Sequence, residues 1–154
     1  MRRPCMTTDM TTDMTTDIGA VGALTAALLL ALAPASAETL LLKADLSGAS
    51  EVPPNQSPAK GAVTATYDTS SKVLTWKGNY SGLSGDATAA HFHGPADPGK
   101  NAGVAVAIKP FASPFEGTAT LTDGQAADLM AGRWYVNIHT AGNPGGELRG
   151  QLTK

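Results

Sequence analysis

Short runs in which apolar and polar residues alternate fill most of the chain, and clusters of glycine and proline separate them. In one such run Val63, Ala65 and Tyr67 fall on one face, because successive side chains of a strand point to opposite sides. This two-residue period predicts many short strands joined by tight turns. The predicted strands are residues 40–46, 61–68, 72–80, 87–93, 103–109, 117–121, 133–139 and 147–152.

One segment follows a helical period instead. Thr122 and Gln125 have the spacing of a capping box, and Ala126 and Leu129 then share one face at helical spacing. We therefore expect one short connecting helix at residues 123–131. Together these elements predict an all-β domain, an antiparallel Greek-key sandwich or flattened barrel of about eight strands.

The start of the chain has the layout of a secretion signal. Two arginines follow the first methionine, residues 18–33 are almost wholly apolar, and the small residues 35–37 provide a peptidase site. This layout predicts a signal peptide at residues 1–37, whose removal leaves a periplasmic or secreted domain at residues 38–154. A membrane anchor is the alternative, since an apolar run of this length nearly spans a bilayer, but an anchor needs no cleavage site.

Composition narrows the classes of function. The chain has 11 basic and 13 acidic residues, and a nearly neutral domain offers no electrostatic basis for binding nucleic acid or an anionic membrane. The one cysteine, Cys5, falls in the predicted signal, so the exported domain has neither disulfides nor thiolate chemistry. The sequence also lacks a serine nucleophile motif and a phosphate-binding loop.

The three histidines of the chain fall on the outward side of their predicted strands. His91 and His93 flank Phe92, and the alternation of side chains turns Phe92 toward the core and both imidazoles away from it. His139 ends a strand whose tryptophan, valine and isoleucine take the core face, so its imidazole points outward too. If the two strands are neighbours in the sheet, the three rings converge.

Three converging imidazoles would form a metal site with an open coordination position. Neutral imidazole nitrogens bind copper and zinc well, whereas calcium and magnesium prefer oxygen ligands. The candidate ligands are His91, His93 and His139. The alternative is that these histidines are polar surface residues, hydrogen-bonded to their neighbours or to water.

The last predicted hairpin adds polar residues to the same side of the sheet. Residues 143–146 form a turn that returns the chain beside the preceding strand. Glu147 then lies near Tyr135 and Asn137, and these three residues are candidates for contacts behind the metal ligands. Glu147 is also a candidate fourth ligand, and the alternative is a surface ion pair between Glu147 and Arg149.

Four blocks of the chain resemble the signature segments of the CHRD domain, which is named after chordin. They read LSGASEVPP (46–54), AAHFHGP (89–95), YVNIHT (135–140) and NPGGELRGQL (143–152). The resemblance extends from about residue 40 to residue 152. It implies an extracellular β module that occurs widely in bacterial exported proteins, with no generally assigned enzymatic activity, and it gives the histidines no catalytic role.

A weaker likeness is to copper/zinc superoxide dismutase, a Greek-key barrel whose copper site uses a His-x-His pair and a later histidine. His91, His93 and His139 correspond to that subset, but the chain has no further histidine to bridge to zinc and no exported cysteine. The likeness implies copper before zinc. Met130 is the only methionine beyond the predicted signal, which favours copper(II) held by imidazoles over a thioether-rich copper(I) carrier.

We therefore predict an exported CHRD-like domain that binds one transition-metal ion, copper before zinc, for capture, delivery or redox tuning. Two other functions stay open. One is an adhesive or assembly module of the cell envelope, whose histidine face contacts another protein. The other is a dismutase-like copper oxidoreductase, although a non-enzymatic role is favoured.

Overall fold

The alternating segments of the chain form eight strands in the computed structural model, which describes residues 37–154. Every strand begins and ends within two residues of its predicted bounds, as expected when the apolar period sets the element. The elements are β1 (Thr39–Ser47), the 3₁₀ turn η1 (Gly48–Ser50), β2 (Lys60–Asp68), β3 (Val73–Ser81), β4 (Ala87–His93), β5 (Val104–Ala107), β6 (Phe115–Thr120), α1 (Asp123–Met130), β7 (Tyr135–Thr140) and β8 (Leu148–Gln151).

The predicted signal peptide at residues 1–37 lies outside the described residues, except for its last residue. Within residues 37–154, no helix is both long enough and apolar enough to cross a membrane.

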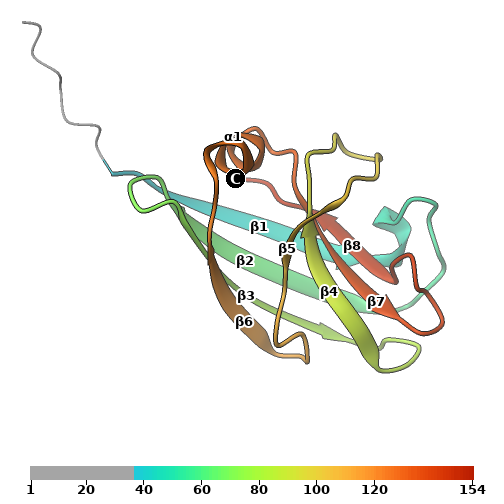
Figure 1. The fold of residues 1–154 in the computed structure, drawn as a ribbon. Helices are drawn as coiled ribbons and strands as arrows, with labels where there is room; N and C mark the ends of the chain where they lie inside the picture. The colour runs from blue at the N-terminus through green and yellow to red at the C-terminus, as the bar shows by residue number, and fades with distance from the viewer. Residues whose placement is uncertain (1–36) are drawn as a thin grey trace, which may run out of the picture. The chain divides into compact units, whose positions relative to one another are not determined.

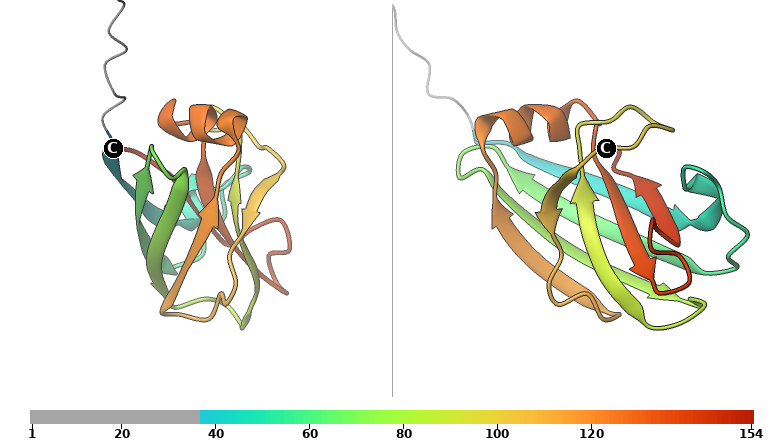
Figure 2. Two further views of the ribbon diagram at one scale, coloured as in Figure 1. Left: turned by 60° about the vertical axis from the view of Figure 1, so that its left-hand side comes forward. Right: turned by 45° about the vertical axis from the view of Figure 1, so that its right-hand side comes forward.

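The strands join into one antiparallel sheet that coils into a nearly closed barrel (Figures 1 and 2). The strand order is β5-β4-β7-β8-β1-β2-β3-β6, so strands that are distant in sequence become neighbours. In particular, β4 pairs with β7, and β7 pairs with β8. The predicted fold class, an all-β antiparallel flattened barrel of about eight strands with one short helix, is confirmed.

Side chains from opposite walls of the barrel meet in one apolar core. Trp76 on β3 and Phe92 on β4 are in edge-to-face contact with ring centroids 5.1 Å apart, and Trp134 packs 6.1 Å from Phe92. Phe92 is fully buried. Because side chains alternate along β4, a buried Phe92 requires that His91 and His93 point away from the core.

The helix α1 lies across one end of the barrel (Figure 2). Its predicted capping box is present: the Gln125 amide N–H donates to Thr122 Oγ1, and the Thr122 amide N–H donates to Gln125 Oε1. Gln125 Nε2 also donates to the Ala105 carbonyl of β5, while Leu129 is buried in the core. The cap therefore starts the helix and ties it to the edge strand.

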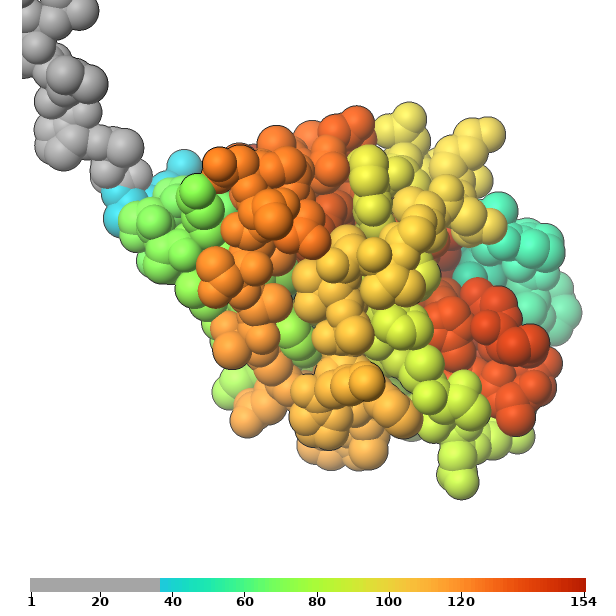
Figure 3. Space-filling view, in the orientation of Figure 1, coloured from blue at the N-terminus to red at the C-terminus, as the bar shows by residue number. Residues whose placement is uncertain are grey.

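Two loops, residues 48–59 and 94–103, cover the outward side of β7 and β8. Asn55 in the first loop donates to two carbonyl oxygens just before β8, and Arg149 on β8 donates to the second loop. As a result Asn137 and Arg149, which both point outward, are each only 2% exposed. Periodicity gives the direction of these side chains but not what lies over them. In Figure 3 these loops, in turquoise and yellow, lie beside the red C-terminal hairpin.

Candidate metal centre

The pairing of β4 with β7 brings the three histidines together. His91 lies opposite Asn137 in the register, and His139 lies opposite Ala89, so the imidazoles occupy adjacent outward positions of two neighbouring strands. One ring nitrogen from each histidine lies within 4.8 Å of the other two. The convergence expected for neighbouring strands is therefore present.

Two backbone carbonyls fix the tautomers of two of these rings. His93 Nδ1 lies 3.0 Å from the Ala102 oxygen, and His139 Nδ1 lies 2.9 Å from the Pro144 oxygen. A carbonyl oxygen only accepts hydrogen bonds, so Nδ1 carries the proton in both rings. Each neutral ring then has a bare Nε2, which is the form that a metal ion binds.

The third histidine is joined to the second one. His91 Nδ1 lies 3.2 Å from His139 Nε2, and because that Nε2 is bare, His91 is the donor of this hydrogen bond. Two nitrogens bound to one ion at 2.0–2.1 Å with tetrahedral to square-planar angles are about 2.9–3.4 Å apart. The observed separation fits either a shared proton or a shared ion. The widest separation of up to 4.8 Å slightly exceeds the roughly 4.2 Å possible across one ion, so binding requires a small side-chain adjustment.

His93 supplies the clearest sign that a partner is missing. Its Nε2 is buried and has no hydrogen-bond partner among the described residues. A buried nitrogen lone pair without a partner is costly and rare in folded proteins. A metal ion bound to this nitrogen would satisfy it, so the residues present fit a transition metal.

Burial favours the neutral form of His91 and of His93. It lowers the pKa of His91, and the neighbouring His139 and His93 lower it further. It also lowers the pKa of His93, against the hydrogen bond to Ala102, which raises it. Because metal ions compete with protons for imidazole nitrogens, both shifts favour metal binding near pH 7.

The strands that carry the histidines lie within a segment that matches a known family. The model of the CHRD domain matches residues 42–152, which include β4, β7 and β8. The chain belongs to the CHRD domain family. Searches of curated proteins and of solved structures found no match.

Tyr135, one of the three polar candidates, contacts a histidine ring. Its ring is stacked on that of His93, with centroids 4.9 Å apart and planes within 4°. Its hydroxyl accepts a hydrogen bond from the Ala102 amide at 3.2 Å and lies 3.4 Å from the Ala102 oxygen. Tyr135 therefore contacts both His93 and the residue that holds His93 Nδ1.

Asn137 and Glu147 lie deeper in the CHRD domain than the histidine cluster. Asn137 Nδ2 donates to Glu51 Oε1 at 2.6 Å and to the carbonyl oxygen of Leu148. Glu147 is not a member of the histidine cluster. The suggested surface ion pair between Glu147 and Arg149 is wrong, since both residues are buried and no such pair forms within residues 37–154.

Glu147 is instead a buried carboxylate that joins three segments by hydrogen bonds. Burial alone would raise its pKa, but hydrogen bonds from Ser57, Thr140 and Ser84 together hold the pKa at about 2. These donors come from the loop before β2, from β7 and from the loop before β4. Asn143 adds a further bond from the turn between β7 and β8. Glu147 thus fixes the turn that also presents the carbonyl holding His139.

Sequence reasoning missed Glu51. Burial raises the pKa of this carboxyl to about 7, although Arg149 and Asn137 both act in the opposite direction. Glu51 lies in the first of the four family blocks, and its neighbours on β7 and β8 are polar residues at alternate positions. That alternation was the available signal, but it is equally typical of an exposed strand.

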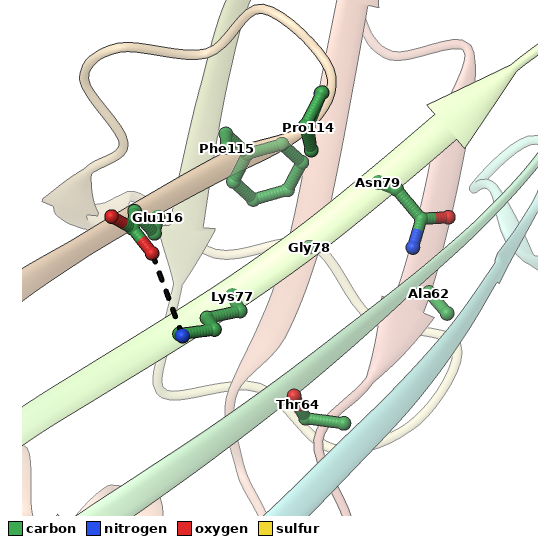
Figure 4. A pocket seen from close by; sticks show the side chains of 8 residues that line it. All are labelled: Ala62, Thr64, Lys77, Gly78, Asn79, Pro114, Phe115 and Glu116. Carbon is green, nitrogen blue, oxygen red and sulfur yellow. Dashed lines mark ion pairs between the residues drawn. The ribbon is translucent and has the colours of Figure 1, made fainter.

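A hollow on the other wall of the CHRD domain lacks this chemistry (Figure 4). It has a volume of about 530 Å³ and opens on the outward side of β2, β3 and β6. Its charged groups are Lys77 and Glu116, which form one ion pair at 3.7 Å, and both side chains are about three-quarters exposed. An exposed pair of this kind contributes little energy, and no histidine lines the hollow.

Proposed function

We propose that this CHRD domain is an exported module that binds one transition-metal ion, copper before zinc, through His91, His93 and His139. Its role would be capture, delivery or redox tuning of the ion. Family membership supports an extracellular or envelope module, and the proposed periplasmic or secreted location follows from the signal layout of residues 1–37.

The observation that carries the proposal is the buried, unpartnered Nε2 of His93 within a cluster of three ring nitrogens. His139 would bind through Nε2, because its Nδ1 proton is engaged by Pro144. His91 would offer Nδ1 to the same point in the tautomer that carries its proton on Nε2, in which the hydrogen bond to His139 is given up. Water-exposed polar histidines would need neither a bare buried nitrogen nor two carbonyl-fixed tautomers.

Copper is favoured by the donor set. Three neutral imidazoles without a carboxylate or thiolate suit copper(II) well, and copper exceeds zinc in intrinsic affinity for nitrogen ligands. A bound copper ion would supply one-electron chemistry and an open coordination position. The chain's own contribution is to hold three ring nitrogens together and to favour the neutral form of His91 and His93, whose pKa values are lowered by burial.

The test is a titration of the protein with copper(II) and with zinc(II), followed by calorimetry and paramagnetic resonance. We expect one ion per chain and a copper(II) spectrum with hyperfine coupling to nitrogen. His93→Ala and His139→Ala should each weaken binding at least a hundredfold. Asn79→Ala, an exposed substitution on β3, is the matched control and should bind as the wild type does.

Binding that survives both histidine substitutions, or no binding at all, would refute the metal site. In that case an envelope module that acts through protein contacts would be the better account. Superoxide consumption by the loaded protein above that of free copper would extend the proposal to a dismutase-like oxidoreductase.

A further inference from the structure

Tyr135 lies between a proposed metal ligand and a buried cation. Its ring is stacked on His93, and the guanidinium carbon of Arg149 lies 3.6 Å from the centre of the same ring. Because β7 lies between β4 and β8 in the sheet, the imidazole and the guanidinium flank Tyr135 from opposite sides. The three groups form a column, and because Tyr135 is 3% exposed and Arg149 is 2% exposed, the part of this column formed by these two residues is shielded from water.

The same two residues hold the loop that orients His93. Arg149 donates to the Lys100 oxygen at 2.6 Å and to Asn101 Oδ1 at 2.8 Å. The next residue, Ala102, is held by the Tyr135 hydroxyl and accepts the His93 Nδ1 proton. Three consecutive residues of the loop are therefore fixed by groups that also belong to the column.

The column has two separable effects on His93. The stacking and the Ala102 hydrogen bond restrict the ring to one plane and one tautomer, which prepares Nε2 for a ligand. The guanidinium contributes a permanent positive charge, since arginine stays protonated in proteins. Glu51, the buried acid whose pKa Arg149 lowers, forms no ion pair with Arg149 among the described residues, so no salt bridge holds the guanidinium.

We propose that Tyr135 and Arg149 are positioning residues of the three-histidine site. Tyr135 fixes the His93 ring, and Arg149 fixes the loop and disfavours the more highly charged form of a bound ion. The inference rests on the proposed metal site. Its consequence for copper is a higher reduction potential, because a nearby positive charge destabilises copper(II) more than copper(I).

The first experiment needs no metal. Nitrogen-correlated proton NMR of the metal-free protein should show a slowly exchanging proton on His93 Nδ1. Tyr135→Phe keeps the stack and should keep this signal, whereas Tyr135→Leu should lose it. Thr75→Val, on the exposed side of β3, is the control. An unchanged signal in Tyr135→Leu would overturn the positioning role.

The second experiment uses the copper-loaded protein. Tyr135→Leu should weaken copper(II) binding by about tenfold or more, and Tyr135→Phe should restore it to within about threefold. Arg149→Gln should lower the copper(II)/copper(I) reduction potential, while Arg149→Lys, which keeps the charge, should leave it near the wild-type value. Equal shifts in Arg149→Gln and Arg149→Lys would overturn the electrostatic role.

The two experiments separate the failure of this inference from failure of the proposed function. If the wild type binds neither copper nor zinc, the metal site is refuted, but the NMR measurement still decides whether Tyr135 fixes His93. Should Tyr135→Leu fail to fold, Tyr135→Phe remains informative, because it removes only the hydroxyl contacts with Ala102. Faster hydrogen exchange of the Ala102 amide in that variant would support the role of the Tyr135 hydroxyl in holding Ala102, and unchanged exchange would refute it.

Discussion

The outward sides of β7–β8 and of β2–β3 carry the same alternating pattern of polar residues but end in different environments. On β2 and β3 the outward residues, such as Thr66 and Thr75, are exposed. On β7 and β8 they are covered by two loops, and Asn137 and Arg149 are almost fully buried. Burial turns equivalent positions into a connected polar layer, because each buried polar group must find a partner.

The comparison teaches where the chemistry of this fold lies. The histidine cluster borders the covered side, where carbonyls fix tautomers and burial shifts pKa values. The open side has charged and hydroxyl groups too, but water surrounds and screens them. Substitutions at matched positions on the two sides therefore form direct tests of the difference.

The largest expected effect is loss of the Glu147 carboxylate. Glu147→Ala would leave buried donors from Ser57, Ser84 and Thr140 without an acceptor, which should lower the free energy of unfolding by about 3–5 kcal/mol. Urea unfolding followed by circular dichroism would measure it. The control on the open side is Glu116→Ala, which should change the value by less than about 0.5 kcal/mol. Similar losses of unfolding free energy in both variants would show that the covered and open sides do not differ as proposed.

The next largest loss of stability is expected from a substitution at one of two adjacent glycines. Gly146 has a φ of 134°, and a Cβ there would collide with Asn137 Nδ2 and Glu51 Oε1, whereas nothing lies within 4 Å of a Cβ on Gly145. Gly146→Ala should cost about 2–4 kcal/mol, and Gly145→Ala should cost about 0.5 kcal/mol or less. Thermal unfolding of both variants would measure the difference. Equal melting temperatures would show that Asn137 and Glu51 shift at little cost to make room for the added Cβ.

The titration of Glu51 gives a pH-dependent effect. Its pKa is raised to about 7 from 4.5, so the folded protein binds this proton more tightly and stability should fall as pH rises from about 4.5 to 7. Glu51→Gln removes this loss, and the variant should be about 1–3 kcal/mol more stable than the wild type at pH 8. At pH 4 the difference should shrink. A constant difference across this range would contradict the buried, proton-binding carboxyl.

Glu147 gives stability the opposite dependence on pH. Its pKa is lowered to about 2 from 4.5, so the stability it contributes is present above pH 4.5 and is lost as pH falls toward 2. One buried layer thus contains a carboxyl that favours folding when protonated and another that favours it when ionised. The difference follows from their partners: several hydroxyl and amide donors surround Glu147, whereas Glu51 accepts one side-chain hydrogen bond, from Asn137.

The sequence was sufficient for the strands, the capped helix and the outward direction of the histidines. Phe92 between His91 and His93 defined that direction, since a large apolar side chain must be buried. Adjacency of β4 and β7 was only a condition of the hypothesis, because 41 residues separate the ends of these strands and periodicity carries no pairing information. The four family blocks supplied the family, but not the pairing of strands.

The covered layer could not be predicted, because the covering loops have no period. Residues 48–59 and 94–103 are rich in glycine, proline and small polar residues, a composition typical of open turns. Their position depends on long-range bonds, such as that from Asn101 to the Val52 oxygen. A buried Glu51 and an exposed Glu116 therefore look alike in the sequence.

The smallest expected effect is the coupling between Lys77 and Glu116 on the open side. Their charged groups lie 3.7 Å apart on exposed side chains, so solvent and salt screen the attraction and ordering both chains costs entropy. A double-mutant cycle of Lys77→Ala and Glu116→Ala should give a coupling of about 0–0.5 kcal/mol that vanishes in 1 M salt. The same cycle on Glu51→Gln and Asn137→Leu should give a larger, salt-insensitive coupling, because their hydrogen bond is buried. If the exposed pair coupled as strongly as the buried one, covering by the loops would not explain why the chemistry of the domain gathers on β7 and β8.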